Sequence, residues 1–109
     1  MMNTFEGKTA LVTGSSRGIG RAAALKLAAL GAKVIFHGAK ESEKLRSAVA
    51  EAGDKAECLT ADFGNMDEVV KLASTLRERD MVPDILVLNA SVQSYTGLGN
   101  FDSAEFLLT

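Results

Sequence analysis

The sequence contains no tryptophan, and cysteine, histidine, proline and tyrosine occur once each. The single cysteine, Cys58, excludes a disulfide within the chain, and no second soft metal ligand stands near it. We expect Cys58 to lie in a strand as a small apolar side chain without chemistry. The single histidine, His37, excludes most histidine-based metal sites. The sequence therefore predicts no metal site.

A charge excess of one sign and long apolar runs are also missing. The formal net charge is -2 and the 12 Lys and Arg residues are spread along the chain, so no basic patch indicates nucleic acid. No apolar run is long enough to span a bilayer, and the first residues lack the apolar core of a secretory signal. With 109 residues, 47% hydrophobic and 24% charged, the composition is typical of one globular domain. We expect a cytoplasmic protein that binds neither nucleic acid nor membrane.

Short apolar runs alternate with amphipathic stretches along the chain. The apolar runs predict strands at Lys8–Thr13, 34–36, Lys55–Thr60 and Ile85–Leu88. The last run has no polar alternation, which indicates burial on both faces, and Pro83 separates it from the preceding helix. As the outermost strand of this chain, however, Ile85–Leu88 would expose an unpaired edge and apolar side chains, so the chain by itself should be weakly stable or associate there.

Helical periodicity predicts three helices between these strands, and Gly31 and Gly53 are expected to end the first two. Asn65 and Glu68 resemble a capping pair at the start of the third helix, and Asp102 with Glu105 resembles the cap of a further one. The apolar stripes are Ile19, Ala23, Leu27 and Leu30, then Leu45, Ala48, Val49 and Ala52, then Met66, Val69, Val70, Ala73 and Leu76.

Strands that alternate with helices on short connections predict an α/β fold with a doubly wound parallel sheet and right-handed crossovers. The expected spatial order of the strands is third, second, first, fourth. A ligand of such a sheet binds where the order reverses, which here is the crevice between the first and fourth strands.

The segment Thr13–Gly20 joins the first strand to the first helix at that crevice. Its glycines, Gly14, Gly18 and Gly20, allow a tight turn, a close approach of backbone to a pyrophosphate and close packing of the helix. The start of the helix adds unpaired N–H groups and a partial positive charge. The segment therefore indicates a phosphate cradle for a nicotinamide dinucleotide, the alternative being a tight bend without a ligand.

With this glycine motif, Asp62 after the third strand and Leu88-Asn89-Ala90-Ser91 after the fourth, the sequence resembles the short-chain dehydrogenase/reductase family. The opening residues 5–14 look particularly like the 3-oxoacyl-carrier-protein reductase branch. The resemblance covers practically the whole chain but only the N-terminal half of a family member. It implies that residues 1–109 are the N-terminal part of a single Rossmann-like dinucleotide-binding domain whose C-terminal catalytic half is absent.

The resemblance also implies roles for individual residues. The glycine segment would wrap the pyrophosphate and adenosine ribose, Asp62 and Phe63 would meet the adenine, and the fourth-strand motif would lie by the nicotinamide-side ribose. Proteins of the family usually have Asn-Asn-Ala-Gly at that motif, whereas here Leu88 and Ser91 replace its first and last residues. The alternative for Asn89 is an ordinary turn cap at a strand end. The implied cofactor-binding set is Gly14, Ser15, Ser16, Arg17, Gly18, Ile19, Gly20, Asp62, Phe63, Asn89, Ala90 and Ser91.

The tip of the second strand, at Gly38, bears on the choice between NADP and NAD. An acidic residue there would bond the ribose hydroxyls and repel a 2′-phosphate, but residues 37–40 contain no carboxylate. Arg17 and Lys40 could both reach a phosphate, so we favour NADP over NAD, the alternative being that both are solvated surface charges. His37 lies near adenine or is an exposed loop histidine without a role, and Ala39 belongs to the same tip.

The catalytic residues of the family are missing. Members use a Ser, a Tyr and a Lys four residues after the Tyr, but Tyr95 is followed four residues later by Gly99. We predict no catalytic residue and no activity for this chain alone. It would bind the cofactor for a hydride transfer to a small carbonyl or alcohol substrate, such as a 3-oxoacyl thioester, in a homo-oligomer such as a tetramer. The alternatives are a non-catalytic nucleotide-binding or regulatory module and a structural relic that binds nothing.

Overall fold

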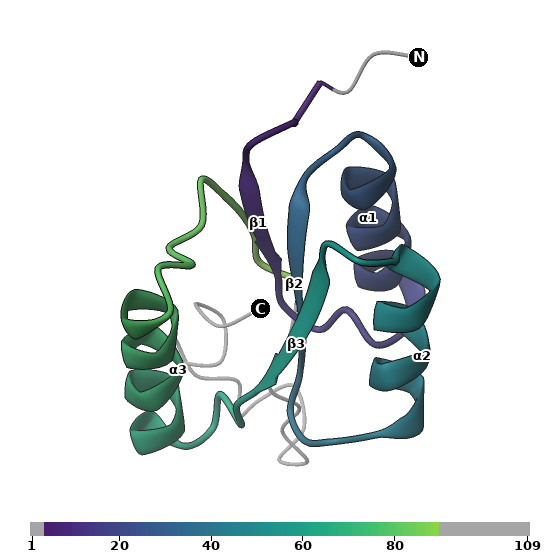
Figure 1. Cartoon of the computed structure of the whole chain (residues 1–109). Helices are drawn as coiled ribbons and strands as arrows, with labels where there is room; N and C mark the ends of the chain where they lie inside the picture. The colour runs from purple at the N-terminus through teal and green to yellow at the C-terminus, as the bar shows by residue number, and fades with distance from the viewer. Residues whose placement is uncertain (1–3, 90–109) are drawn as a thin grey trace, which may run out of the picture.

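The computed structural model describes residues 4–89, in which strands and helices alternate (Figure 1). The strands are β1 (Thr9–Val12), β2 (Lys33–Gly38), β3 (Ala56–Thr60) and β4 (Ile85–Val87), and the helices are α1 (Gly18–Ala29), α2 (Glu43–Ala52) and α3 (Met66–Glu78). Each strand and helix predicted within this range is present. The helix predicted from Asp102 lies outside the described residues. No helix between residues 4 and 89 is both long and apolar enough to cross a membrane.

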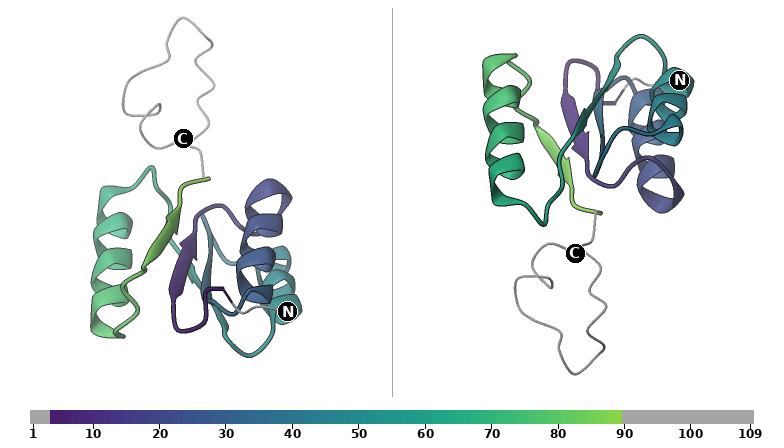
Figure 2. Two further views of the ribbon diagram at one scale, coloured as in Figure 1. Left: turned by 90° about the horizontal axis from the view of Figure 1, so that it is seen from above. Right: turned by 90° about the horizontal axis from the view of Figure 1, so that it is seen from below.

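The four strands form one parallel sheet in the order β3-β2-β1-β4, which confirms the predicted fold class. Val12 of β1 stands opposite Phe36 of β2 on one side and Val87 of β4 on the other. The order therefore reverses at β1, and the carboxyl ends of these strands meet at one edge of the sheet. Helices α1 and α2 cover one face and α3 covers the other (Figure 2).

Alternating residues of β1 and β2 supply two apolar clusters, one on each face of the sheet. Val12 and Phe36 point toward α1 and α2, where Leu45 is also fully buried. Leu11 and Ile35 point the other way and pack with residues of α3. Because both faces of these two strands are buried, the end of β1 and the end of β2 are held firmly in place.

Four positions of the predicted apolar stripes are exposed, namely Ile19 in α1 and Met66, Val70 and Ala73 in α3, whose buried residues are Leu72 and Leu76. Ile19 is 82% exposed, because it lies in the first turn of α1, where Gly20 and then Ala24 take the positions that face the sheet. Leu86 in β4 is 55% exposed and the strand as a whole is only half-buried, which agrees with the expectation that this run exposes apolar side chains as the outermost strand of the chain. Within the described residues β4 has one neighbour, β1, so the burial on both faces that its apolar run indicates is not reached.

The helix ends agree with the predicted signals except in one detail. Gly31 and Gly53 adopt positive φ angles of 101° and 100° just after α1 and α2. The Asn65 side chain accepts a hydrogen bond from the Asp67 N–H at 3.0 Å, as a cap should. Glu68 does not complete the capping pair, because its carboxylate accepts from the Asp62 N–H at 2.9 Å. The carboxylate thus ties α3 to the loop that follows β3.

We expect Leu45→Ala to lower the free energy of unfolding by about 2–5 kcal/mol, because it leaves a cavity under α2 in the fully buried cluster. Val70→Ala on α3 is the control, since Val70 is exposed and its truncation should change stability by less than about 0.5 kcal/mol. Urea denaturation followed by circular dichroism measures both. Equal losses in the two variants would contradict the packing described.

Candidate functional site

The loop between β1 and α1 lies at the point where the strand order reverses. The Thr13 N–H donates to the Val87 carbonyl of β4 at 3.0 Å, and the Ser15 N–H donates to the His37 carbonyl of β2 at 2.8 Å. The loop is therefore fastened to both strands that flank β1. This is the crevice expected to hold the ligand of a doubly wound sheet.

Gly14 is bonded through both of its backbone polar groups. Its N–H donates to Nδ1 of His37 at 3.0 Å, and its carbonyl oxygen accepts from Nδ2 of Asn89 at 3.1 Å. The backbone N–H of Asn89 donates in turn to Oγ1 of Thr13 at 2.8 Å. The side chains of His37, in β2, and Asn89, after β4, thus hold Gly14 on both of its backbone groups.

Gly20 brings the first turn of α1 against this loop. A Cβ at this position would overlap the Gly14 carbonyl oxygen and would lie 2.6 Å from Nδ2 of Asn89. Gly18 is required for a different reason, since its φ is +63° and a Cβ there would meet open space. The glycine spacing therefore serves close backbone packing at one position and a left-handed turn at another.

The N-terminus of α1 differs from those of the other two helices. Helix α2 begins with a side-chain cap from Ser42, α3 begins with one from Asn65, and both have acidic residues in their first turns. At α1, Arg17 provides no side-chain cap and the first turn holds no acidic residue. The first N–H groups of a helix have no partner within it and carry partial positive charge. This end of α1 consequently suits a phosphate group.

His37 is buried in β2, with 2% of its surface exposed, so it is not an exposed loop histidine. Its ring stacks on Phe63, with centroids 4.4 Å apart and planes 14° from parallel, and not on a surface open to adenine. Nε2 lies 2.9 Å from the Ala61 carbonyl oxygen. Burial lowers the pKa of His37, and the bond to Ala61 opposes this shift in part. The His37 ring is therefore committed to contacts inside the protein.

Ser15 is also committed to internal contacts. It is fully buried, and its hydroxyl donates to the Val12 carbonyl at 2.7 Å and accepts from the His37 N–H at 2.8 Å. Ser15 can thus support the loop but does not present its hydroxyl to a ligand.

Asp62 and Phe63 are the pair predicted to meet adenine. Asp62 is exposed and its Oδ1 accepts from the Gly64 N–H at 2.9 Å, while Phe63 is half-buried against His37.

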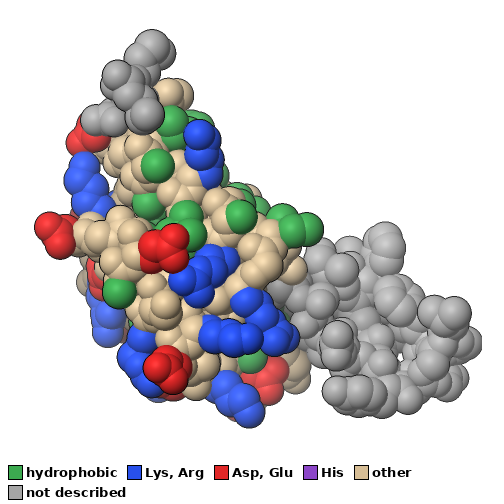
Figure 3. Space-filling view, turned by 90° about the vertical axis from the view of Figure 1, so that its right-hand side faces the viewer, with side chains coloured by type: hydrophobic (Ala, Val, Ile, Leu, Met, Phe, Trp, Pro, Cys, Tyr) green, Lys and Arg blue, Asp and Glu red, His purple; other side chains and the backbone are tan. Residues whose placement is uncertain are grey.

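The tip of β2 carries no free carboxylate. Gly38 is buried beside Leu45, and Ala39 and Lys40 are exposed. The next acidic residue, Glu41, forms an ion pair with Arg46 at 3.2 Å. Figure 3 shows Lys and Arg side chains on the lower part of the face formed by α1 and α2, the end from which both helices begin, with Asp and Glu side chains among them. The tip of β2 itself therefore offers the exposed cation Lys40 and no unpaired carboxylate.

The remaining predicted residues fall into two groups. Arg17 and Ile19 are exposed at the start of α1, and Ser16 is half-buried before it. Ala90, Ser91 and Tyr95 lie outside the described residues. The structure brings four of the predicted parts of the site together: the glycine segment, the end of β2, the loop after β3 and Asn89.

His37 and Asn89 were both predicted to lie at the site, but the sequence did not predict that they hold Gly14. His37 and Asn89 are 23 and 75 residues away from it, so no local spacing indicates either contact. One signal for His37 was available, because it is the single polar residue between the apolar run Val34–Phe36 and Gly38. A polar side chain at that place in a buried strand needs an internal partner.

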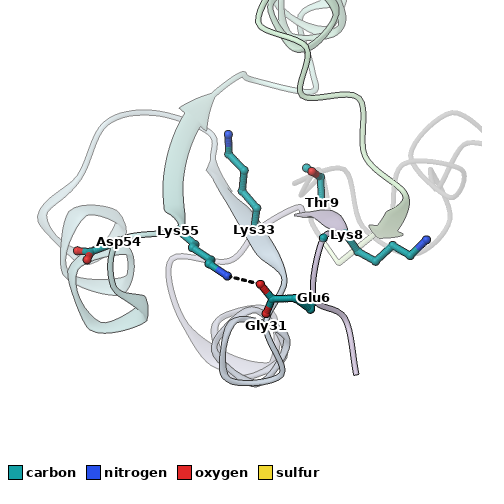
Figure 4. Close-up of a pocket in the computed structure, with 8 residues that line it drawn as sticks. Glu6, Lys8, Thr9, Gly31, Lys33, Asp54 and Lys55 are labelled. Carbon is teal, nitrogen blue, oxygen red and sulfur yellow. Dashed lines mark hydrogen bonds and ion pairs between the residues drawn. The ribbon is translucent and has the colours of Figure 1, made fainter. Parts of the chain in front are cut away.

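An open pocket lies at the opposite end of the strands, around the starts of β1 and β2 (Figure 4). Two of its charged lining residues, Lys55 and Glu6, pair with each other at 2.9 Å, and Lys33 pairs at 3.3 Å with Glu57, which lies outside the lining. This pocket is separate from the glycine loop and shares none of its residues.

Comparison with known proteins identifies the class to which this fold and loop belong. The family model described as short chain dehydrogenase matches residues 8–107, and the chain belongs to that family. The family binds nicotinamide dinucleotides, which agrees with the open start of α1.

Two curated relatives illustrate the similarity. The chain is 42% identical over 105 residues to the short chain dehydrogenase mdpC of Emericella nidulans, which covers 94% of the chain and 40% of the relative. It is 42% identical over 94 residues to a 3-oxoacyl-[acyl-carrier-protein] reductase of Synechocystis, covering 84% of the chain and 38% of the relative. The chain thus spans about two fifths of the length of these relatives.

Solved structures agree. The 2-keto-3-deoxy-D-gluconate dehydrogenase of Streptococcus agalactiae matches with a TM-score of 0.76 and 33% identity, covering 96% of this chain and 40% of that one. The reductase LugOII, described as catalysing keto-reduction during lugdunomycin biosynthesis, matches with a TM-score of 0.71 and 42% identity over 84% of this chain and 41% of that one.

We expect Gly20→Ala to destabilise the protein although alanine is the better helix former by about 1 kcal/mol. The new methyl group would strike the Gly14 carbonyl and Asn89, and overpacking of this kind costs about 1–3 kcal/mol. Thermal unfolding should show a lower midpoint than the parent chain.

Gly64→Ala is the matched control, because the added Cβ would meet only the movable carboxylate of Asp62 at 3.2 Å. Its midpoint should stay near that of the parent. An unchanged or higher midpoint for Gly20→Ala would show that the helix and the loop do not pack as closely as described.

Proposed function

We propose that this chain supplies the dinucleotide-binding portion of an NADP(H)-dependent oxidoreductase, which transfers a hydride between the nicotinamide and a carbonyl or alcohol substrate. The observation that carries the proposal is the uncapped, acid-free start of α1 beside the glycine loop. The same sheet contains two helices whose starts are capped and acidic, so the open start of α1 is a local feature and not a general property of the chain.

The bound dinucleotide would supply the hydride, and this chain would bind and orient the dinucleotide. The pyrophosphate would lie against the first N–H groups of α1, where Gly18 leaves open space. Asp62 and Phe63 would border the adenine, and Asn89 would border the nicotinamide-side ribose while its amide holds Gly14. Ser15 and His37 would contribute through the loop conformation, because both side chains are buried.

NADP is preferred over NAD in this proposal for two reasons. Arg17 and Lys40 are exposed at the two segments that would border the adenosine ribose, and an Arg guanidinium binds phosphate through charge-assisted hydrogen bonds. The nearest carboxylate beyond the tip of β2, Glu41, is paired with Arg46. A 2′-phosphate would therefore meet cations and no free carboxylate at that tip.

Catalysis would depend on groups beyond those in this chain, since its one tyrosine, Tyr95, has glycine and not lysine four residues later. We therefore assign no catalytic residue. The substrate would be a small carbonyl or alcohol compound, and similarity to a 3-oxoacyl-[acyl-carrier-protein] reductase favours a 3-oxoacyl thioester. We further propose that the protein acts in the cytoplasm as a homo-oligomer such as a tetramer.

We expect the chain to bind NADPH more tightly than NADH, and Arg17→Ala to weaken NADPH binding by about 10- to 100-fold, the equivalent of one lost hydrogen bond to a charged group. NADH binding should change little, because NADH lacks the 2′-phosphate. Isothermal titration calorimetry of both cofactors against both proteins measures the difference.

Arg79→Ala is the matched control, since Arg79 is an exposed arginine at the far end of α3, and it should leave both affinities unchanged. Equal affinities of the parent chain for NADPH and NADH would contradict the assignment of NADP. Absence of binding by a folded chain would contradict the proposed function itself.

A further inference from the structure

We propose that His37 is a positioning residue that holds the glycine loop in its binding conformation only while its ring is neutral, so that one proton on the ring releases Gly14 and weakens dinucleotide binding. The proposal rests on the proposed function for the ligand, but the clamp itself is a property of the fold. It is carried by the bonds that join the ring to two separate loops.

The two ring contacts determine which nitrogen carries the proton. The backbone N–H of Gly14 can only donate, so Nδ1 of His37 must be the unprotonated nitrogen that accepts it. The Ala61 carbonyl can only accept, so Nε2 must carry the proton and donate it. Both bonds form together only in the neutral tautomer with its proton on Nε2.

Protonation of the ring is incompatible with this arrangement. A proton on Nδ1 would face the Gly14 N–H, leaving two donors opposed across 3.0 Å without an acceptor. The ring is buried, so neither group could turn to water without movement of the loop. Gly14 is the residue against which Gly20 and the first turn of α1 pack, and its displacement would disturb the start of that helix.

The ring also connects the parts of the candidate site that come from different strands. On the side of the glycine loop, the His37 backbone bonds to Ser15 and Nδ1 bonds to Gly14. On the side of the loop after β3, Nε2 bonds to Ala61 and the ring face stacks on Phe63. One side chain therefore sets the spacing between the segment proposed for the pyrophosphate and the segment proposed for the adenine.

Within residues 4–89, the groups that bond to or stack on the ring are those of Gly14, Ala61 and Phe63, and none of them is charged. The charged groups on the segments around it are Arg17 and Lys40, which are exposed, Asp62, which bonds the Gly64 N–H, and Glu68, which bonds the Asp62 N–H. Burial lowers the pKa of His37 below its ordinary value of about 6.5. The clamp is thus intact near neutral pH and should open as the pH falls through the lowered pKa.

The first test observes the ring directly in the chain without a ligand. Two-bond ¹H–¹⁵N spectra of His37 near pH 7.5 should show an unprotonated Nδ1 and a protonated Nε2, with a titration midpoint below that of a histidine in a peptide. A protonated Nδ1 at this pH, or a titration midpoint at or above the peptide value, would overturn the proposal. This result does not depend on whether any dinucleotide binds.

The second test measures binding against pH with NAD⁺, because the 2′-phosphate of NADP itself titrates at a pKa of about 6. The affinity of the parent should be constant near pH 8 and should fall by up to about tenfold per pH unit below the pKa of His37, the limit for one excluded proton. Circular dichroism at each pH shows whether the chain stays folded. A flat affinity profile across the measured titration of His37 would overturn the proposal.

Two variants separate the clamp from general stability. In His37→Asn the side-chain oxygen lies near the place of Nδ1 and can accept from Gly14 but cannot titrate, so the acid loss of affinity should disappear. The loss of the Ala61 bond and of the Phe63 stack lowers its affinity by the same factor at every pH. His37→Phe keeps a ring against Phe63 but supplies no acceptor, and should bind about tenfold more weakly at every pH.

Retention of the acid loss in His37→Asn, or parent-like affinity in a folded His37→Phe, would overturn the proposal. If neither variant folds, the ring spectra and the pH profile of the parent still decide the matter. If NAD⁺ and NADPH both fail to bind the folded parent, the proposed function is wrong, whereas the ring spectra still confirm or reject the clamp.

Discussion

The two hydrogen bonds on the backbone of Gly14 are the contacts on which the rest of the site depends. In one, the Gly14 N–H donates to the ring of His37 at 3.0 Å, and in the other its carbonyl accepts from the amide of Asn89 at 3.1 Å. They join the loop after β1 to the ends of the strands on both sides of it. Because buried or half-buried backbone groups must be paired, these two side chains determine where the loop can lie. The helix that follows takes its position from the loop through Gly20.

This arrangement explains why the start of α1 can remain open. Helices normally satisfy their first N–H groups with a capping side chain, as α2 and α3 do. The loop before α1 is held by hydrogen bonds to β2 and β4, so the helix can begin at its place without a side-chain cap. The N–H groups of its first turn are then available to an anion, and membership of the short-chain dehydrogenase family agrees with such a use.

Local patterns were sufficient for the elements and their order. The apolar runs and glycine stops indicated each strand and helix within residues 4–89, and short connections between them led to the parallel order β3-β2-β1-β4. The same patterns were wrong about Ile19, because Gly20 and Ala24, and not Ile19, take the positions of α1 that face the sheet. They were also wrong about Glu68, whose carboxylate accepts from the N–H of Asp62 and not from that of Asn65.

The sequence by itself determined the α/β class, the glycine loop at the reversal point and the absence of a carboxylate at residues 37–40, because each is encoded in residues adjacent along the chain. Only the tertiary structure decided that His37 faces inward and holds Gly14, that Ser15 is buried, and that the amide of Asn89 bonds the loop. The physical reason is that these contacts join residues from different strands, and a hydrogen bond acts only at the distance that the folded sheet creates between them.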